Sequence, residues 1–587
     1  MPAQTTASPA ITVKAGGTPL PAAVAAQLLE LLVDQRGDAP DLFRLTFHDP
    51  ELKLLEEPSL AAGKEISVEI EVDPNLKGVL TVGEVTSVAL DDDAWGTQVV
   101  VQGMDRSHVL FRTRTARTFL NATFSDVVKK LAEEAGLGAQ VQSSPTVHEY
   151  LSQSGQTDWE FLHGLADQIG WDLWLENRTL HFAEPATATS GSGPVPKLTR
   201  GVNLFHLTAV LTAGGQPQQV ESRGWNPQEK QAVVGRATTS PTVGVDAGIG
   251  SPASFRGLFD TGTMDLTRAP HRTQAEADAA ASAAAEDVAS AFVELQAAAF
   301  GDPRIKARGV VEIANAGDRI SGRYVVTQVR HVWEPEAGYR TELNITGRQD
   351  RSLLGLAGGG TAHAAAAPQI HGVVVGVVTN NKDPENLGRV KVKFPWWSDS
   401  EESDWARVAQ VLTGNGYGAL IMPEVNDEVL VAFEHGHMDR PYVVGSLYNG
   451  KDHPAKTSDE IIGSGGKVGS QRLESRSHHR LVFFDQEGSK EGVTLRTGDD
   501  KYYINLNKTD TTIVVSSDGD VRVEAKNGTV TVEAQEMQLK STGKLEATAQ
   551  GSATLKSAGK FTVEGTGGLE LKSSGVVEVK GSLIKLN

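Results

Sequence analysis

The last hundred residues of the chain carry its most regular hydrophobic pattern. Two apolar side chains at positions i and i+2 recur along this stretch, and successive pairs are seven to nine residues apart. Glycine follows an eight-residue spacing, at Gly543, Gly551, Gly559, Gly567 and Gly575. Because side chains alternate between the two faces of a strand, the pairs predict short strands with one apolar face, and each glycine predicts a turn.

An eight-residue unit cannot bury its own apolar side chains, and it is shorter than the roughly 18-residue coil of a single-chain left-handed β-helix. Three copies winding together would enclose the apolar pairs along one axis. We therefore predict a needle over residues 481–587, formed as a triple-stranded β-helix in a homotrimer, with a solvated single-chain β-solenoid as the alternative. The predicted needle core consists of Val521, Val523, Val530, Val532, Leu545, Leu555, Phe561, Val563, Leu569, Leu571, Val577 and Val579.

Upstream of the needle, the pattern predicts mainly β structure with some α-helix. Residues 65–101 alternate between apolar and polar side chains and read as strands. Helical spacing of apolar residues predicts short helices at residues 124–135, where Ser125 can act as the N-cap, and at residues 158–169. An alanine-rich stretch predicts a longer helix over residues 273–300.

The second half of the chain shows three changes of composition. Residues 353–368 are small and glycine-rich, as is typical of a linker. Residues 369–450 contain short apolar runs at the spacing of a small barrel of about five strands, and one of these runs lies at residues 418–423. Residues 451–480 are polar and predict a connector before the needle.

Length, charge and cysteine content exclude several classes of protein. The 587 residues are enough for about three or four domains. The absence of cysteine excludes disulfide frameworks, thiolate zinc sites and cysteine nucleophiles, and a net charge of −19 argues against a nucleic-acid partner. The N-terminus lacks the pattern of a secretory signal and no stretch is long and apolar enough for a membrane span, so we expect synthesis in the cytoplasm.

Two sets of longer motifs stand out in the chain. The barrel region contains GRVKVKFPW at residues 388–396, WARVAQ at 405–410, GYGAL at 416–420, EVLVAF at 428–433 and DRPYVVGSLYN at 439–449. Upstream lie TDWEFLHGLA at residues 157–166, GRYVVTQVRH at 322–331 and GYRTEL at 338–343. The barrel motifs resemble the spike proteins of contractile injection systems, which are called VgrG in type VI secretion, and the upstream motifs resemble the tail-hub domain of the same proteins.

The resemblance implies a domain order and a mechanical function. Residues 1–352 would form a tail-hub domain of barrel-like subdomains, similar to the phage late-control-D proteins, and residues 369–450 an OB-fold domain similar to baseplate V. The family is trimeric and non-enzymatic, and it punctures the target envelope when the sheath contracts. It implies no cofactor. The particle could be a phage tail, a type VI system or a phage-tail-like injection particle, possibly released outside the cell.

The resemblance also implies the partners. The N-terminal ring of the trimer would contact the inner tube protein and other baseplate or hub proteins. A small tip protein of the PAAR type would cap the needle at its last apolar layer, for which we predict contacts with Ile584, Leu586 and Asn587.

Two histidine pairs are candidates for metal binding. His435 and His437 could hold a metal on one face of a strand, but no third ligand lies nearby in the sequence except Glu434, which would point to the other face. An exposed loop is the expected explanation. A solvated turn explains the adjacent His478 and His479, so we expect no metal site.

Trp396 and Trp397 could form a carbohydrate platform, although we expect them to anchor the barrel or its trimer contact. A spike-associated cell-wall hydrolase and a trimeric receptor-binding fibre are the alternative functions. About 30 residues join the barrel to the needle, too few for a hydrolase domain of ordinary size. The sequence contains no G-x-S-x-G, H-E-x-x-H or P-loop motif.

Overall fold

The computed structural model describes residues 9–37, 39–94, 96–189, 194–212, 216–239, 244–248, 250, 262–266, 270–347 and 369–586. The predicted linker at 353–368 and the predicted tip contact Asn587 lie outside these residues. The chain divides into two compact units, Met1–Pro454 and Ala455–Asn587, and each is described by itself.

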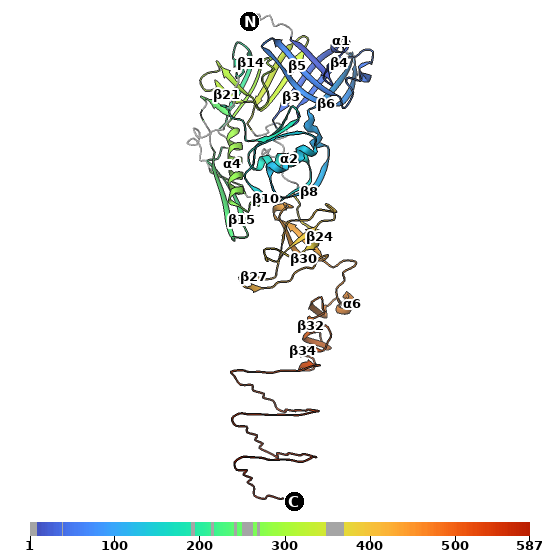
Figure 1. The fold of residues 1–587 in the computed structure, drawn as a ribbon, viewed down its shortest axis with the longest axis vertical. Helices are drawn as coiled ribbons and strands as arrows, with labels where there is room; N and C mark the ends of the chain where they lie inside the picture. The colour runs from blue at the N-terminus through green and yellow to red at the C-terminus, as the bar shows by residue number, and fades with distance from the viewer. Residues whose placement is uncertain are drawn as a thin grey trace. The chain divides into compact units, whose positions relative to one another are not determined.

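An 11-stranded antiparallel sheet forms one end of the first unit, at the top of Figure 1. Its strand order is β14-β19-β23-β22-β3-β4-β7-β6-β5-β1-β2, so strands from both ends of the hub region meet where β22 pairs with β3. The strands are β1 (Ala10–Ala15), β2 (Thr18–Pro19), β3 (Leu28–Arg36), β4 (Leu42–His48), β5 (Glu65–Asp73), β6 (Leu76–Asp93), β7 (Gly96–Met104), β14 (Leu204–Leu211), β19 (Val293–Phe300), β22 (Gln328–Glu334) and β23 (Gly338–Ile345). Two short helices, α1 (Ala22–Ala25) and η1 (Leu54–Glu56), lie in its connections.

A smaller α/β part follows, in which two helices share one hydrophobic core with their neighbouring strands. Strand β10 pairs with β8, and β11, β12 and β9 form a second sheet. The elements are η2 (Arg106–Phe111), β8 (Arg114–Thr123), α2 (Phe124–Glu134), β9 (Gly138–Val141), β10 (Val147–Thr157), α3 (Asp158–Gln168), β11 (Asp172–Glu176) and β12 (Thr179–Ala183).

Both predicted helices of this part are confirmed, but the predicted cap of the first is wrong. Thr123 is the N-cap of α2, and it forms a capping box with Asp126. Ser125 already lies inside the helix, where its backbone N–H donates to Ser144 Oγ at 3.1 Å. Helix α3 has the same motif, with Thr157 as N-cap and Glu160 three residues later.

Two further sheets and a helix complete the hub region. Helix α4 (Gln274–Ser290) packs on strands β15 (Gln219–Asn226) and β16 (Gln231–Thr238), which share a sheet with β18 (Thr263–Leu266). The other sheet contains β13 (Lys197–Thr199), β20 (Val310–Ala314), β21 (Gly322–Val325) and β17 (Val245–Ala247).

The helix predicted over residues 273–300 is too long. It ends at Ser290, and residues 293–300 form strand β19 between β14 and β23. Alternate side chains of this strand, from Val293 to Ala299, are buried in the core beneath the large sheet. Burial at period two and backbone pairing on both sides therefore outweigh the helix propensity of its alanines.

The barrel that ends the first unit is closed and contains five strands, as the sequence predicts. The strand order is β24 (Val373–Asn380), β25 (Arg389–Lys393), β26 (Ala406–Val408), β30 (Pro441–Ser446) and β29 (Glu428–Phe433). The strand expected at residues 418–423 is absent. A short hairpin stands there instead, formed by β27 (Thr413–Gly414) and β28 (Tyr417–Gly418), and a turn η4 (Glu434–Gly436) follows β29.

The second unit begins with a short helix, α6 (Ser458–Ile461), and a five-stranded antiparallel sheet. The strands follow one another in chain order: β31 (Ser470–Glu474), β32 (Arg480–Gln486), β33 (Lys490–Arg496), β34 (Tyr502–Asn507) and β35 (Thr512–Ser517). Strand β31 lies in the stretch that the sequence analysis assigns to the connector. The sequence does not predict this strand, because its pairing with β32 leaves no periodic pattern. No described helix is long and apolar enough to cross a membrane.

Candidate functional site

The sheet of the second unit exposes an apolar face. Cross-strand partners align on this face in two rows, because antiparallel registers place apolar side chains opposite one another. Most of these side chains are exposed, for example Leu495 at 56% and Ile513 at 75%. The rows contain Leu481, Leu495, Ile504 and Val515, and Phe483, Val493, Leu506 and Ile513.

Residues 518–586 continue this apolar surface without any strand of their own. The chain bends about every eight residues, and Gly543, Gly551, Gly559, Gly567 and Gly575 all lie at bends, as the sequence predicts. Figure 1 shows an open, stepped path. Between residues 519 and 586, the backbone forms one hydrogen bond to itself, from Gly568 N to Gly565 O at 3.3 Å.

The residues predicted to form the needle core lie along this path, and every one of them is exposed in the single chain. Their exposed fractions run from 53% at Val577 to 85% at Leu555. Ile584 and Leu586, the described members of the predicted tip contact, are 49% and 90% exposed. Their assignment to a needle core and a tip contact stays a prediction, since it depends on chains beyond this one.

An extended chain of this kind has unmet bonding capacity. Each residue carries a backbone N–H and C=O, and these groups are almost always paired when they are shielded from water. Exposed apolar side chains at regular intervals add surface that water disfavours. The repeating apolar side chains and unpaired backbone groups of residues 518–586 therefore form a surface suited to pairing with the strands of other chains.

A second feature, which the sequence reasoning missed, is the contact between the hub region and the barrel within the first unit. The Tyr150 hydroxyl donates to the backbone carbonyl of Glu402 at 3.0 Å, and burial raises the pKa of that tyrosine. The Thr118 hydroxyl donates to Glu401. These contacts join β8 and β10 to the loop between β25 and β26.

Charged side chains occupy the same contact. Arg272, which precedes α4, lies 3.9 Å from Asp404 of the barrel. Arg440, in the DRP motif, lies 3.6 Å from Asp439. Burial alone would lower the pKa of Arg440, but the surrounding carboxylates, led by Asp439, raise it. Glu276 of α4, in the hub region, is also among these carboxylates, so the buried Arg440 guanidinium is attracted by carboxylates on both sides of the contact.

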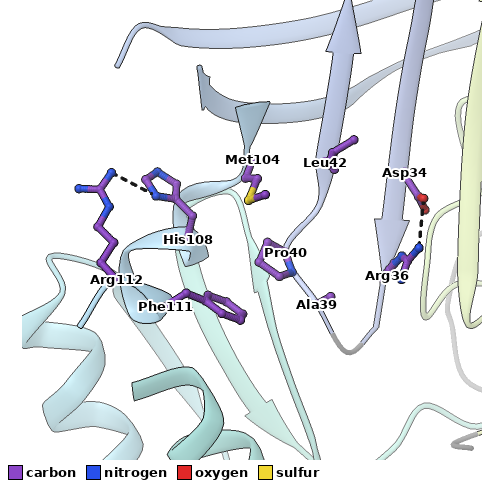
Figure 2. A pocket seen from close by; sticks show the side chains of 9 residues that line it. All are labelled: Asp34, Arg36, Ala39, Pro40, Leu42, Met104, His108, Phe111 and Arg112. Atoms are coloured by element: carbon purple, nitrogen blue, oxygen red, sulfur yellow. Dashed lines mark hydrogen bonds and ion pairs between the residues drawn. The ribbon is translucent and has the colours of Figure 1, made fainter. Parts of the chain in front are cut away.

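The first unit also has an open pocket of about 440 Å³ between the β3–β4 connection and η2 (Figure 2). Its charged groups are paired. Arg36 lies 3.5 Å from Asp34. Arg112 donates a hydrogen bond to His108 Nδ1 at 3.2 Å, so this nitrogen is the acceptor of the ring. His108 Nε2 therefore carries the ring proton, and it lies 3.0 Å from Glu84. Burial alone would raise the pKa of Glu84, but the His108 hydrogen bond and Arg106 lower it.

The histidine pairs form no metal centre among the described residues, where no group of three or more possible ligands comes together. His435 lies in the turn η4 with φ of 50°. His478 has φ of 62°, and its Nδ1 lies 2.8 Å from Glu474 Oε1. Both of these histidines belong to turns.

The tryptophan pair belongs to the barrel. Trp397 is partly buried against the barrel core. Trp396 is 51% exposed, and its Nε1–H donates to the carbonyl of Val375 at 3.2 Å while its ring lies 5.7 Å from that of Phe394. One ring thus anchors the barrel and the other lies on its surface.

Comparison with known proteins shows which class of protein has this fold and these surfaces. A family model described as the type VI secretion system and phage-baseplate injector OB domain matches residues 374–448, the barrel. A spike protein of Vibrio cholerae, VgrG3, is 34% identical over 146 residues, which cover 22% of this chain and 14% of that protein. The Pseudomonas aeruginosa spike protein VgrG1b is 24% identical over 381 residues, covering 58% of this chain and 48% of that protein. The chain is a VgrG-like protein.

A second family model matches the N-terminal part of the chain and assigns the chain to its family. A model described as the Alg8 N-terminal domain matches residues 10–334, more than half of the chain, and the chain belongs to this family. A chain of the Francisella PdpA–VgrG complex in its half-lidded form shares the fold, with a TM-score of 0.51 at 10% identity, over 87% of this chain and 88% of that chain. The chain spans 12% to 48% of the length of five of the curated relatives it matches.

The predicted fold class is thereby confirmed as mainly β with an OB barrel, whereas the triple-stranded β-helix stays a prediction.

Proposed function

We propose that three copies of this chain form the non-enzymatic spike of a contractile injection system. The observation that carries the proposal is the stepped path of residues 518–586, which is extended, apolar on one side and unpaired along its backbone. Three such paths wound together would pair their backbones and enclose their apolar side chains. The predicted boundaries at residues 352, 368, 450 and 480 are part of this proposal.

The spike would act by transmitting force. Backbone hydrogen bonds between chains and a continuous apolar axis would let the needle carry a push along its length when the sheath contracts. The N-terminal hubs would form a ring on the inner tube and baseplate, and a PAAR-like protein would cap the far end at Ile584, Leu586 and Asn587. The chain would be made in the cytoplasm and incorporated into the particle.

The similarity of the barrel to the injector OB domain, and of 381 residues of the chain to the spike protein VgrG1b, favours this function over a receptor-binding fibre, which needs neither. Electron microscopy of purified chain mixed with the inner tube protein of the same particle tests it. We expect one spike at one end of each tube. Tubes that stay uncapped, although the chain is trimeric, would contradict the spike function and leave the trimer standing.

A further inference from the structure

The barrel carries a protruding arm, and most of its large apolar side chains are exposed in the single chain. We define the arm as residues 409–423, between β26 and β29. It has a set conformation: β27 and β28 pair, Ala419 N donates to Leu412 O at 2.9 Å, and the Gln410 side chain bonds both backbone groups of Ile421 at 3.0 Å. A two-stranded hairpin with no packing partner is marginally stable in water.

The arm is rooted in the barrel and exposed at its tip. Met422 packs against the barrel core, and the Pro423 carbonyl accepts a hydrogen bond from Asn381 at 3.3 Å. The side chains farther out are exposed, up to 92% at Val411. The large exposed apolar side chains of the arm are Val411, Leu412, Tyr417, Leu420 and Ile421.

A second exposed apolar surface lies elsewhere on the barrel. We call it the β24 patch, and it consists of Val373, Val375 and Trp396. In the closed barrel, β24 neighbours β25 and β29, whereas β26, from which the arm extends, neighbours β25 and β30. The patch lies at the beginning of β24, whereas Asn381, just after the end of β24, bonds the root of the arm, so the two surfaces lie at opposite ends of this strand.

We propose that the arm of one copy packs on the β24 patch of the next copy, so that three barrels close into a ring. This inference rests on the proposed trimer. A cyclic trimer uses one heterologous contact three times, and each copy must supply both of its halves. The barrel supplies two separate apolar surfaces, whereas a single foreign partner would need only one.

Charge favours a second copy of the chain as the occupant. Each chain carries a net charge of −19, so identical copies repel one another unless they meet through neutral surfaces. Residues 408–423 and 369–381 contain no Asp, Glu, Lys or Arg. The arm and the β24 patch are thus neutral surfaces on an acidic protein.

The tether to the needle raises the chance of this contact. Strand β30 ends at Ser446 and α6 begins at Ser458, so 11 residues, at most about 40 Å of extended chain, join each barrel to the first helix of the second unit. Three barrels held on such tethers meet at high effective concentration, which allows a small apolar contact to form.

Crosslinking in the full chain tests the proposal, because the protein has no cysteine of its own. The test variant combines Tyr417→Cys with Trp396→Cys, and each single variant is a control. A matched control combines Tyr417→Cys with Val444→Cys, an exposed position on β30, which β29 separates from β24. Each variant is treated with a short bis-maleimide and run on a denaturing gel, and its mass before treatment is measured by light scattering.

We expect the arm–patch variant to give covalent dimers and trimers, at least fivefold more than any control. Crosslinking confined to one chain, or equal in the single Tyr417→Cys variant, would overturn the arm–patch contact. So would a trimeric mass with no crosslinks in any variant, and each of these results leaves the trimer intact. A monomeric mass in the untreated wild-type chain would instead overturn the proposed function itself.

Discussion

Replacing one side chain of the predicted axis should prevent assembly of the needle, and Val563→Asp is the most informative replacement. Val563 is 55% exposed in the single chain, so assembly would bury about half of its surface. Thr562 lies between Phe561 and Val563 and, in an extended segment, faces the opposite side. Thr562→Asp is therefore a matched control with the same added charge in the same segment.

The expected cost follows from two contributions. Full burial of a valine stabilises by about 1.5 kcal/mol or more, so losing half of it costs roughly 1 kcal/mol per chain. A buried aspartate must also take up a proton, which at pH 7, against a reference pKa of about 3.9, costs roughly 4 kcal/mol. The sum is about 5 kcal/mol per chain, and three chains meet at the same layer. Thr562→Asp, which stays in water, should cost less than about 1 kcal/mol.

Size-exclusion chromatography with light scattering at micromolar concentration measures the outcome. We expect monomer for Val563→Asp and trimer for Thr562→Asp. Trimer should partly return for Val563→Asp near pH 4, because protonation of the three carboxylates is then nearly free. A trimeric Val563→Asp together with a monomeric Thr562→Asp would show that the inward and outward faces are assigned the wrong way round.

Three further predictions concern the first unit. His331 is fully buried, and burial lowers its pKa to about 4, below the unfolded value of about 6.5. The stability that this histidine contributes is therefore complete above pH 6.5 and should fall by roughly 3 kcal/mol towards pH 4. Urea unfolding should show this loss in the wild type and not in His331→Gln. Gly103→Ala would place a methyl group 2.2 Å from the Phe43 ring. The urea unfolding midpoint of this variant should fall by at least the equivalent of about 1 kcal/mol. An unchanged midpoint would contradict the close packing of β4 and β7. Arg440→Met would remove the Arg440 cation from the carboxylates at the hub–barrel contact and should destabilise it by roughly 3 kcal/mol. Calorimetry should then show a separate, earlier unfolding transition of the barrel. A single unshifted transition would contradict a role of Arg440 in coupling the barrel to the hub region.

Elements defined by local patterns were predictable from the sequence. Helices α2 and α3 follow from apolar spacing within a dozen positions, although the N-cap of α2 is Thr123 rather than Ser125, and the bends of the needle follow from glycines eight residues apart. Local propensity misled where tertiary pairing decides. The alanines of β19 favour a helix, yet β14 and β23 hold them in a strand.

The contacts between distant segments could not be predicted. Arg272 and Asp404 meet across 132 positions of sequence, and no periodic pattern links them. The last part of the arm, residues 418–423, is predicted as a strand, since its apolar residues resemble those of a barrel strand. Three glycines and the Gln410 side chain turn it into a hairpin instead, and Gly416 has φ of 75°.

The mass of the purified full-length chain in solution tests the central claim most directly. Light scattering at micromolar concentration should give three times the 62.4 kDa of one chain, about 187 kDa, and the value should persist on dilution because the apolar rows of three chains enclose one another. A mass of 62.4 kDa would contradict the account, because the exposed apolar path of residues 518–586 would then be the state of the protein in water.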